Sequence, residues 1–290
     1  MRHFLYALLR LSAFCQLAGC VGGGLNTEES QPLSTQWKPL LDDKLSQWEM
    51  FIGVPDPSVT GLPAGTHQAK NYQGTPLGLN HDPKQVFTVL MVDGEPVLHI
   101  TGEIYGCVSS LASYSNYHFR AQFRWGEKKW EPRLNIARDS GVLYHCTGPH
   151  GAFWNVWKSS IESQVCENEF GKLYPLAGTK AKIADAFNGV FKEGQPRPDY
   201  YHEKPTGEWN DLEIYVVGDR SIHLLNGSVV NALSDMKHKV NEKWSKLTAG
   251  QIQIQSEAAE CEYRRVEIRG ITALPDAYQV YWTKSAPTKP

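Results

Sequence analysis

Residues 139–164 read DSGVLYHCTGPHGAFWNVWKSSIESQ, and this stretch decides the predicted fold. An aromatic-rich segment separates two short runs that have the composition of β-strands. Successive side chains of a strand point to opposite faces, so residues two apart share a face. We therefore expect Glu162 and Gln164 to stand side by side on one surface, while their neighbours face a core. The alternative is that both residues form the wet side of a half-exposed strand.

The earlier of the two runs divides in the same way. Alternation puts Tyr144 and Cys146 on one face and Leu143 and His145 on the other. His145 is then expected in the same cleft as Glu162. The predicted cleft therefore holds a titratable imidazole beside a carboxylate.

The side chains expected in this cleft have the composition of a sugar site. Indole rings, here those of Trp154 and Trp157, cover the apolar faces of pyranose rings. Amides and carboxylates hold hydroxyl groups, and Gln164 and Glu162 supply one of each. The stretch therefore predicts a small carbohydrate as ligand.

Strand signals recur through most of the chain. Residues 117–125 alternate between apolar and polar side chains, as is typical of a half-buried strand. The dipeptides Asp93-Gly94 and Asn226-Gly227 are typical of tight hairpin turns. Many short strands at even spacing, without alternating helices, favour an all-β jelly-roll sandwich over a parallel α/β sheet.

Few segments depart from the strand pattern. Residues 53–84 are rich in Gly, Pro, Asn and His, and they predict a long surface loop. Loops of that length in a compact domain tend to be functional or disordered. Residues 183–190 and 232–247 are predicted to hold no more than a turn or two of helix each.

The N-terminus has the pattern of an export signal. A short apolar run ends in LAGC at 17–20, which matches the bacterial lipoprotein signal and makes Cys20 the expected lipid-bearing residue. Val21 follows the cysteine in place of an acidic residue, which resembles lipoproteins sent on to the outer membrane. We therefore expect a cell-envelope lipoprotein on the outer membrane, facing the periplasm. A plain cleaved signal is the alternative.

These patterns divide the chain into four parts. Residues 1–19 are the predicted lipoprotein signal, and residues 20–36 read as a flexible tether. Residues 37–275 are predicted to form one β domain, and residues 276–290 a C-terminal tail. The formal net charge of the whole chain is −2, so no basic face indicates a nucleic-acid partner, and the membrane is expected to be reached through the lipid alone.

Cysteine usage fits export. Four cysteines follow the predicted lipid site: Cys107, Cys146, Cys166 and Cys261. An oxidising compartment allows up to two bridges among them in three pairings. Cys146 and Cys166 flank the opening stretch and are the preferred candidate disulfide.

Metal-binding motifs are missing from the sequence. There is no CxxC or HExxH pattern, so no zinc site is predicted and no cofactor is assigned. His145, Glu162 and Glu257 are nonetheless acceptable ligands for a divalent cation. Their spacing is that of no metal motif, so only convergence in three dimensions would support such a site.

Eight short motifs, in this order, resemble one family. They read GEIYGCVSS, NYHFRAQFRW, ARDSGVLYH, IESQ, GKLYPLAG, GEWNDLEI, HLLNG and IQIQSEAAECEYRRVEIR. Together they resemble the bacterial 3-keto-disaccharide hydrolase family over about Trp37 to Ile271. The resemblance implies a concanavalin-like jelly roll of two antiparallel sheets whose concave face takes sugar. It also implies cleavage of 3-keto-glycosides by elimination across C1 and C2, followed by hydration of the resulting glucal.

The resemblance also implies site residues. Carried over by position, they are His145, Glu162, Gln164, Gln255, Glu257 and Arg264. Two positions depart from the family pattern. Asp139 stands where the family has Asn, which we expect to be tolerated in a turn. Arg265 stands where the family has a further Asn.

The implied chemistry needs three groups around the sugar. A ketone at C3 acidifies the hydrogen on C2, so a base must take that proton, and His145 or Glu162 is the candidate. Arg264 or a bound cation would hold the enolate oxygen, and Glu257 would act as the acid.

Two rival functions stay open at this point. A glycosidase with paired carboxylates would need Glu162 and Glu257 about 5 to 10 Å apart across the scissile bond. A non-catalytic lectin would bind sugar through Trp154, Trp157 and Gln164 without reacting.

Overall fold

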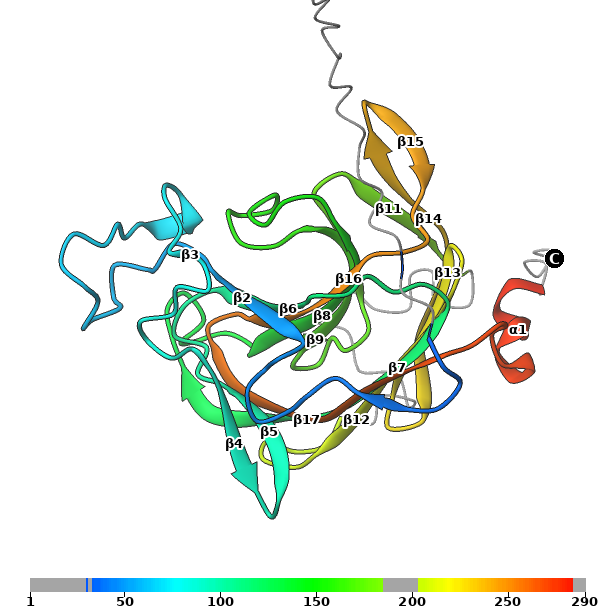
Figure 1. The fold of residues 1–290 in the computed structure, drawn as a ribbon, viewed down its shortest axis with the longest axis horizontal. Coiled ribbons are helices and arrows are strands. Elements are labelled where there is room, and N and C mark those ends of the chain that lie inside the picture. The colour runs from blue at the N-terminus through cyan, green and yellow to red at the C-terminus, as the bar shows by residue number, and fades with distance from the viewer. Residues whose placement is uncertain (1–29, 31–32, 185–202, 284–290) are drawn as a thin grey trace, which may run out of the picture.

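The computed structural model describes residue 30 and residues 33–184 and 203–283. The predicted signal, Cys20 and most of the predicted tether lie outside these residues. The described chain is almost entirely β-structure and folds into two antiparallel sheets that face each other (Figure 1). The predicted all-β, concanavalin-like sandwich is therefore confirmed.

The larger sheet has ten strands. They are β1 (Lys38–Pro39), β4 (Phe87–Val92), β5 (Glu95–Ile100), β7 (Tyr117–Lys129), β11 (Thr179–Ile183), β12 (Asn210–Val217), β13 (Arg220–Leu225), β14 (Ser228–Val240), β15 (Lys243–Lys246) and β17 (Ala259–Gly270). Their order is β11-β14-β13-β12-β7-β17-β5-β4, with β1 added to β17 and β15 to β14.

The smaller sheet has seven strands in the order β10-β9-β8-β16-β6-β2-β3. They are β2 (Trp48–Ile52), β3 (Gly78–Leu79), β6 (Gly106–Ser110), β8 (Asp139–Thr147), β9 (Ser159–Cys166), β10 (Leu173–Leu176) and β16 (Gln251–Ser256). A 3-10 turn, η1 (Lys70–Tyr72), lies in the predicted long loop. The described chain ends in helix α1 (Asp276–Thr283).

The core fills the space between the sheets. The predicted alternation of β7 is confirmed, because Tyr117, Phe119 and Phe123 are fully buried while Arg120 is exposed. Apolar side chains of β8, β9 and β16 pack against them from the smaller sheet. Strand parity thus sets which residues of the smaller sheet face the core and which face outward.

Both predicted hairpin turns are present. Asp93 and Gly94 join β4 to β5, and Asn226 and Gly227 join β13 to β14. All four residues have positive φ, which glycine, asparagine and aspartate tolerate best. The turn chemistry therefore fixes the register of both hairpins.

Two segments differ from expectation. Residues 232–247, predicted to hold no more than a turn or two of helix, instead belong to the long strand β14 up to Val240 and to β15. Residues 276–283, predicted as the start of a tail, form α1, whose Tyr278 and Trp282 pack on Ile222 and Leu224 of the larger sheet. Within the described residues, no helix combines the length and apolar character that crossing a membrane requires.

Candidate active site

Rows of cross-strand neighbours on the outer face of the smaller sheet build a pocket. Directly opposed residues of an antiparallel pair share a face. The register places Gln253, Leu143, Glu162 and Tyr174 in one row, Gly141 and Gln164 in the next, and Glu257 opposite Asp139 in a third. Glu162 and Gln164 therefore lie on adjacent rows of one face, as the alternation of β9 predicts.

The pocket has a volume of about 290 Å³. Its lining residues are Arg133, Asp139, Phe153, Trp154, Trp157, Glu162, Gln164, Tyr174, Pro175, Leu176, Gln255 and Glu257. It thus collects six of the eight predicted catalytic and sugar-binding residues, all except His145 and Arg264: two carboxyls and two amides meet the two predicted indoles. Apolar rings and hydrogen-bonding groups converge as in carbohydrate sites.

A glycine leaves the space for this convergence. At Gly141 an added Cβ would lie 2.2 Å from Glu162 Oε1 and 2.3 Å from Gln255 Oε1. The carboxyl of Glu162 and the amide of Gln255 therefore lie over the bare backbone of β8. Any side chain at position 141 would push both groups aside.

The loop between β8 and β9 supplies the aromatic wall. Trp157 is 1% exposed, and its Nε1 donates to the carbonyl of Gly106 at 3.1 Å. Trp154 is 46% exposed and stands at the rim, stacked on Tyr72 with ring centroids 5.0 Å apart. One indole is thus fixed in the wall, and the other lies partly exposed at the rim, stacked on Tyr72 and Phe153.

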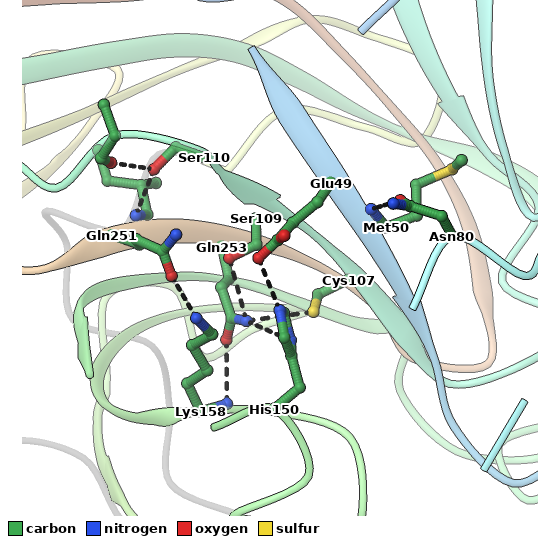
Figure 2. Close-up of polar contacts among 12 residues, drawn as sticks. Glu49, Met50, Asn80, Cys107, Ser109, Ser110, His150, Lys158, Gln251 and Gln253 are labelled. Atoms are coloured by element: carbon green, nitrogen blue, oxygen red, sulfur yellow. Dashed lines mark hydrogen bonds and ion pairs between the residues drawn. The ribbon is translucent and has the colours of Figure 1, made fainter. Parts of the chain in front are cut away.

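A buried polar network holds this loop on the sheet (Figure 2). His150 donates through Nε2 to Glu49 at 2.9 Å and accepts through Nδ1 from the Gln253 amide at 3.4 Å, the tautomer that both contacts require. The Gln253 side-chain oxygen accepts from the backbone N–H of Lys158 at 3.2 Å. The Lys158 ammonium donates to the Gln251 side chain. Both ends of the aromatic loop are therefore tied to the same sheet that carries the carboxyls.

One cation and three carboxyls dominate the electrostatics of the pocket. Arg133 Nη2 contacts Glu257 Oε1 at 2.7 Å and also pairs with Asp139. Glu162 is 5% exposed and lies near the same group. The three carboxyls together outnumber the single guanidinium, so they cannot all be ionised without a large free-energy cost.

Burial and mutual repulsion decide which carboxyls stay neutral. Burial, followed by the charge of Glu257, raises the pKa of Glu162 well above its usual value. The same two causes raise the pKa of Asp139 well above its usual value. Burial also raises the pKa of Glu257, but Arg133 opposes that rise. Glu257 is therefore the member of the cluster best able to carry the negative charge.

Several polar atoms at the pocket lack a partner. Among the described residues, Gln164 Oε1, Gln255 Oε1, Asp139 Oδ1 and Arg133 Nε are buried without a hydrogen-bond partner. An unpaired buried donor or acceptor costs about 1 to 3 kcal/mol. Such a cost is typical of a site whose hydrogen bonds are completed by a ligand.

His145 does not belong to this pocket, so that prediction is wrong. The register of β8 against β9 shifts between Tyr144 and Thr147, and His145 has a φ of 52°. The resulting β-bulge reverses the alternation, turning His145 inward against Tyr117 and Tyr144 and placing Cys146 on the outer face. Burial there lowers the pKa of His145 to about 4.

Arg264 is also placed elsewhere. It lies on β17 of the larger sheet, opposite Gln122, and its Nε donates to that side chain at 2.8 Å. Its guanidinium lies 4.1 Å from the ring centroid of Trp209. Arg264 therefore lies outside the pocket that collects the other predicted polar residues, because its strand belongs to the other sheet.

The predicted Cys146–Cys166 disulfide is not formed. Cys166 is opposite Asp139 at one end of the β8–β9 ladder, whereas Cys146 lies near the other end, where Thr147 is opposite Ser159. All four cysteines of the described chain are free and buried. Cysteines on neighbouring strands meet only where the register of the ladder places them opposite each other, and here it does not.

Two polar residues of the pocket were missed. Arg133 lies in the segment between β7 and β8, which has no periodicity that would reveal its direction. Asp139 was expected in a turn, but it begins β8 and takes part in the carboxyl cluster. Among the described residues, no group of three or more His, Cys, Asp or Glu is arranged to hold a metal ion.

The family of the chain follows from its sequence as a whole. The family model described as the 3-keto-alpha-glucoside-1,2-lyase-like domain matches residues 36–269. The chain belongs to this family. The match covers both sheets and every residue of the pocket, so the pocket lies within the domain that defines the family.

Other comparisons are weaker. No curated protein matches the sequence. Among solved structures, a Parabacteroides distasonis protein provisionally described as a glycosyl hydrolase is 17% identical, with a TM-score of 0.45 over 81% of this chain and 100% of that chain. A Bacillus licheniformis β-glucanase is 10% identical, with a TM-score of 0.40 over 83% of this chain and 100% of that chain. Similarities at this level support no inference about activity.

Proposed function

We propose that this member of a carbohydrate-active family cleaves 3-keto-glucosides by elimination across C1 and C2, followed by hydration. The observation that carries the proposal is the buried cluster of three carboxyls and one guanidinium, beside two unpartnered amide oxygens and an indole wall. Each group that the reaction needs has a counterpart in that cluster.

The first step is removal of the proton on C2. The ketone at C3 makes this hydrogen acidic, because the electron pair left behind is delocalised onto the C3 oxygen as an enolate. Glu257 is the proposed base, since its contact with Arg133 favours its ionised form. Arg133 is the proposed stabiliser of the enolate oxygen, which replaces Arg264 in that role.

The second step expels the leaving group. The enolate electrons re-form the C3 ketone and make a C1–C2 double bond, while the bond from C1 to the glycosidic oxygen breaks. Glu162 is the proposed acid that protonates this oxygen, because burial raises its pKa and so favours its protonated form. Addition of water at C1 and of a proton at C2 then gives the free 3-keto sugar.

Sugar binding is assigned to the other lining groups. Gln164 and Gln255 each offer a buried, unpartnered amide oxygen to a sugar hydroxyl. Trp154, whose indole is 46% exposed at the rim of the pocket, is the proposed apolar contact of the sugar. These three residues would also suffice for a lectin, which is the alternative function.

Turnover separates the enzyme from the lectin. Purified protein incubated with a 3-keto-disaccharide should produce the transient absorbance of the enone and then free 3-keto sugar. Glu162→Gln removes the acid proton with little change in shape and should lower kcat by about 100-fold or more, with an unchanged melting temperature. A wild-type protein that binds the substrate without cleaving it would establish the lectin instead.

We also propose that the protein is exported and lipid-anchored through Cys20, on the strength of LAGC at 17–20. Cys20→Ser should leave the protein in the soluble fraction of cells that hold the wild type in their membranes. Equal distribution of the two proteins would refute the anchor.

A further inference from the structure

A second and larger pocket adjoins the first. It has a volume of about 420 Å³. Its lining residues are Val54, Asp56, Pro57, Ser58, Ala69, Lys70, Asn71, Tyr72, Glu103, Ile104, Tyr105, Glu131 and Pro132. Most of them come from residues 54–72, the first part of the predicted long loop, which the proposed chemistry does not use.

The two pockets share an aromatic wall. Tyr72 and Tyr105 line the second pocket and stack on each other at 4.5 Å. Tyr72 also stacks on Trp154 at 5.0 Å, and Tyr105 lies 5.9 Å from Trp157, both of which line the first pocket. The pockets are therefore neighbours on either side of one group of rings.

Consecutive residues of the chain also contribute to both pockets, close to the carboxyl cluster. Glu131 and Pro132 line the second pocket, and the next residue, Arg133, pairs with Glu257 in the first. Burial and then the charge of Glu257 raise the pKa of Tyr105. The residue that follows Pro132 thus contacts Glu257, the group proposed to start the reaction.

The loop that forms the second pocket is held in place. The Asn155 amide donates to the carbonyl of Tyr72 at 2.7 Å, and the Gln68 amide donates to the carbonyls of Asp56 and Val59 at 2.9 and 2.8 Å. Tyr72 has a φ of 59°, a conformation that a bulky side chain rarely adopts. Contacts with the aromatic loop therefore maintain a strained backbone at the border of the two pockets.

The chemistry of the second pocket selects a neutral, hydroxyl-rich ligand. Asp56, Glu103 and Glu131 face it together with a single cation among its lining residues, Lys70, so an anion would be repelled. Phenol rings and prolines offer flat apolar surface, while carboxylates and an amide offer hydrogen bonds. Such a mixture fits a sugar ring.

We propose that the second pocket binds the leaving group of the substrate as a second sugar ring. The inference rests on the proposed function: with the oxidised ring over Glu162 and Glu257, the bond from C1 leads across Tyr72 into the second pocket. A sugar as leaving group then fills this pocket, whereas a small aglycone leaves it empty.

Filling the pocket tests the inference. Ala69 lines it from extended backbone with a φ of −154°, so Ala69→Trp places an indole there without backbone strain. Ser58→Trp adds an indole at a second lining position of the same pocket. Ala64→Trp is the matched control, because Ala64 is exposed in the same loop and does not line the pocket.

Two substrates that differ only in the leaving group give the readout. For a glucosyl 3-keto-glucoside, Ala69→Trp should lower kcat/KM by about tenfold or more, the effect of losing one well-packed ring. For methyl 3-keto-glucoside the value should stay within about twofold of wild type. Equal losses on both substrates, or no loss on either in both pocket-filling variants, would overturn the second subsite.

Binding separates this inference from the proposed reaction. Calorimetric titration with the same two compounds should show the same selective loss of affinity for the disaccharide, whether or not either compound is cleaved. Selective loss of binding without turnover would refute the enzyme and keep the subsite. A wild type that binds the disaccharide no better than the methyl glycoside would refute the subsite and keep the enzyme.

Discussion

The buried guanidinium of Arg133 should stabilise the protein in a strongly pH-dependent way. Its side chain is 17% exposed and contacts Asp139 and Glu257, whose side chains are 4% and 6% exposed. Arg133→Met leaves these carboxyls without a cation. Deleting one partner of a buried ion pair costs about 3 to 5 kcal/mol, and we expect that loss at pH 8.

The loss should shrink as the pH falls. Burial raises the pKa of both Asp139 and Glu257, so their protonated forms favour the folded state at low pH and their ionised forms oppose it as pH rises. Arg133 reduces this destabilisation only at high pH, where the carboxyls are ionised. At pH 5 we expect Arg133→Met to cost about 1 to 2 kcal/mol, the value of lost hydrogen bonds.

Urea unfolding followed by tryptophan fluorescence at pH 5 and pH 8 measures the difference. Arg265→Met is the matched control, since Arg265 and Glu95 form an exposed pair whose loss should change the free energy of unfolding little at either pH. Adding Glu257→Gln to Arg133→Met should recover stability at pH 8. An equal cost of Arg133→Met at both pH values, with no recovery in the double variant, would refute the assignment of charge in the pocket.

Three further changes test other parts of the account. Asp139→Asn should keep turnover within about threefold of wild type, because a carboxyl held protonated by burial and an amide have the same shape; loss of turnover would mean that Asp139 acts as a charge. Gly141→Ala should lower turnover by about tenfold or more by displacing Glu162, with the methyl resonances of the core unmoved in NMR spectra. Burial lowers the pKa of His145 and His223 to about 4, below about 6.5 in the unfolded chain, so each should withdraw up to about 3 kcal/mol of stability as pH falls from 6.5 to 4. His145→Asn should therefore lose less stability than wild type over that interval in urea unfolding, and parallel curves would contradict the assignment.

The regular alternation of side chains along the strands made part of the site predictable from the sequence. Glu162 and Gln164 share a face because β9 pairs with β8 without interruption at those positions. Gln255 and Glu257 join them because alternation continues along β16 to the bridge between Glu257 and Asp139. Side-chain parity is a local property, so sequence alone can supply it.

The wrong predictions arise where the direction of a side chain, or the sheet to which its strand belongs, depends on residues distant in the sequence. A single bulge turned His145 from the pocket to the core, and no turn residue marks it within the strand. Arg264 was inferred from the resemblance alone, and the sequence did not show that its strand belongs to the larger sheet. Arg133 comes from an irregular segment, whose direction depends on the carboxyls it pairs with after folding.

The most direct test of the central claim is the fate of the hydrogen on C2. Wild-type protein should be given a 3-keto-disaccharide in D₂O, and the released 3-keto sugar analysed by NMR, with the free sugar incubated without protein as the control for spontaneous exchange. Elimination and hydration predict that every released 3-keto sugar carries one deuterium at C2. Glu257→Gln should release almost none of this deuterated sugar. Cleavage that leaves the original hydrogen on C2 would contradict the proposed chemistry of this pocket.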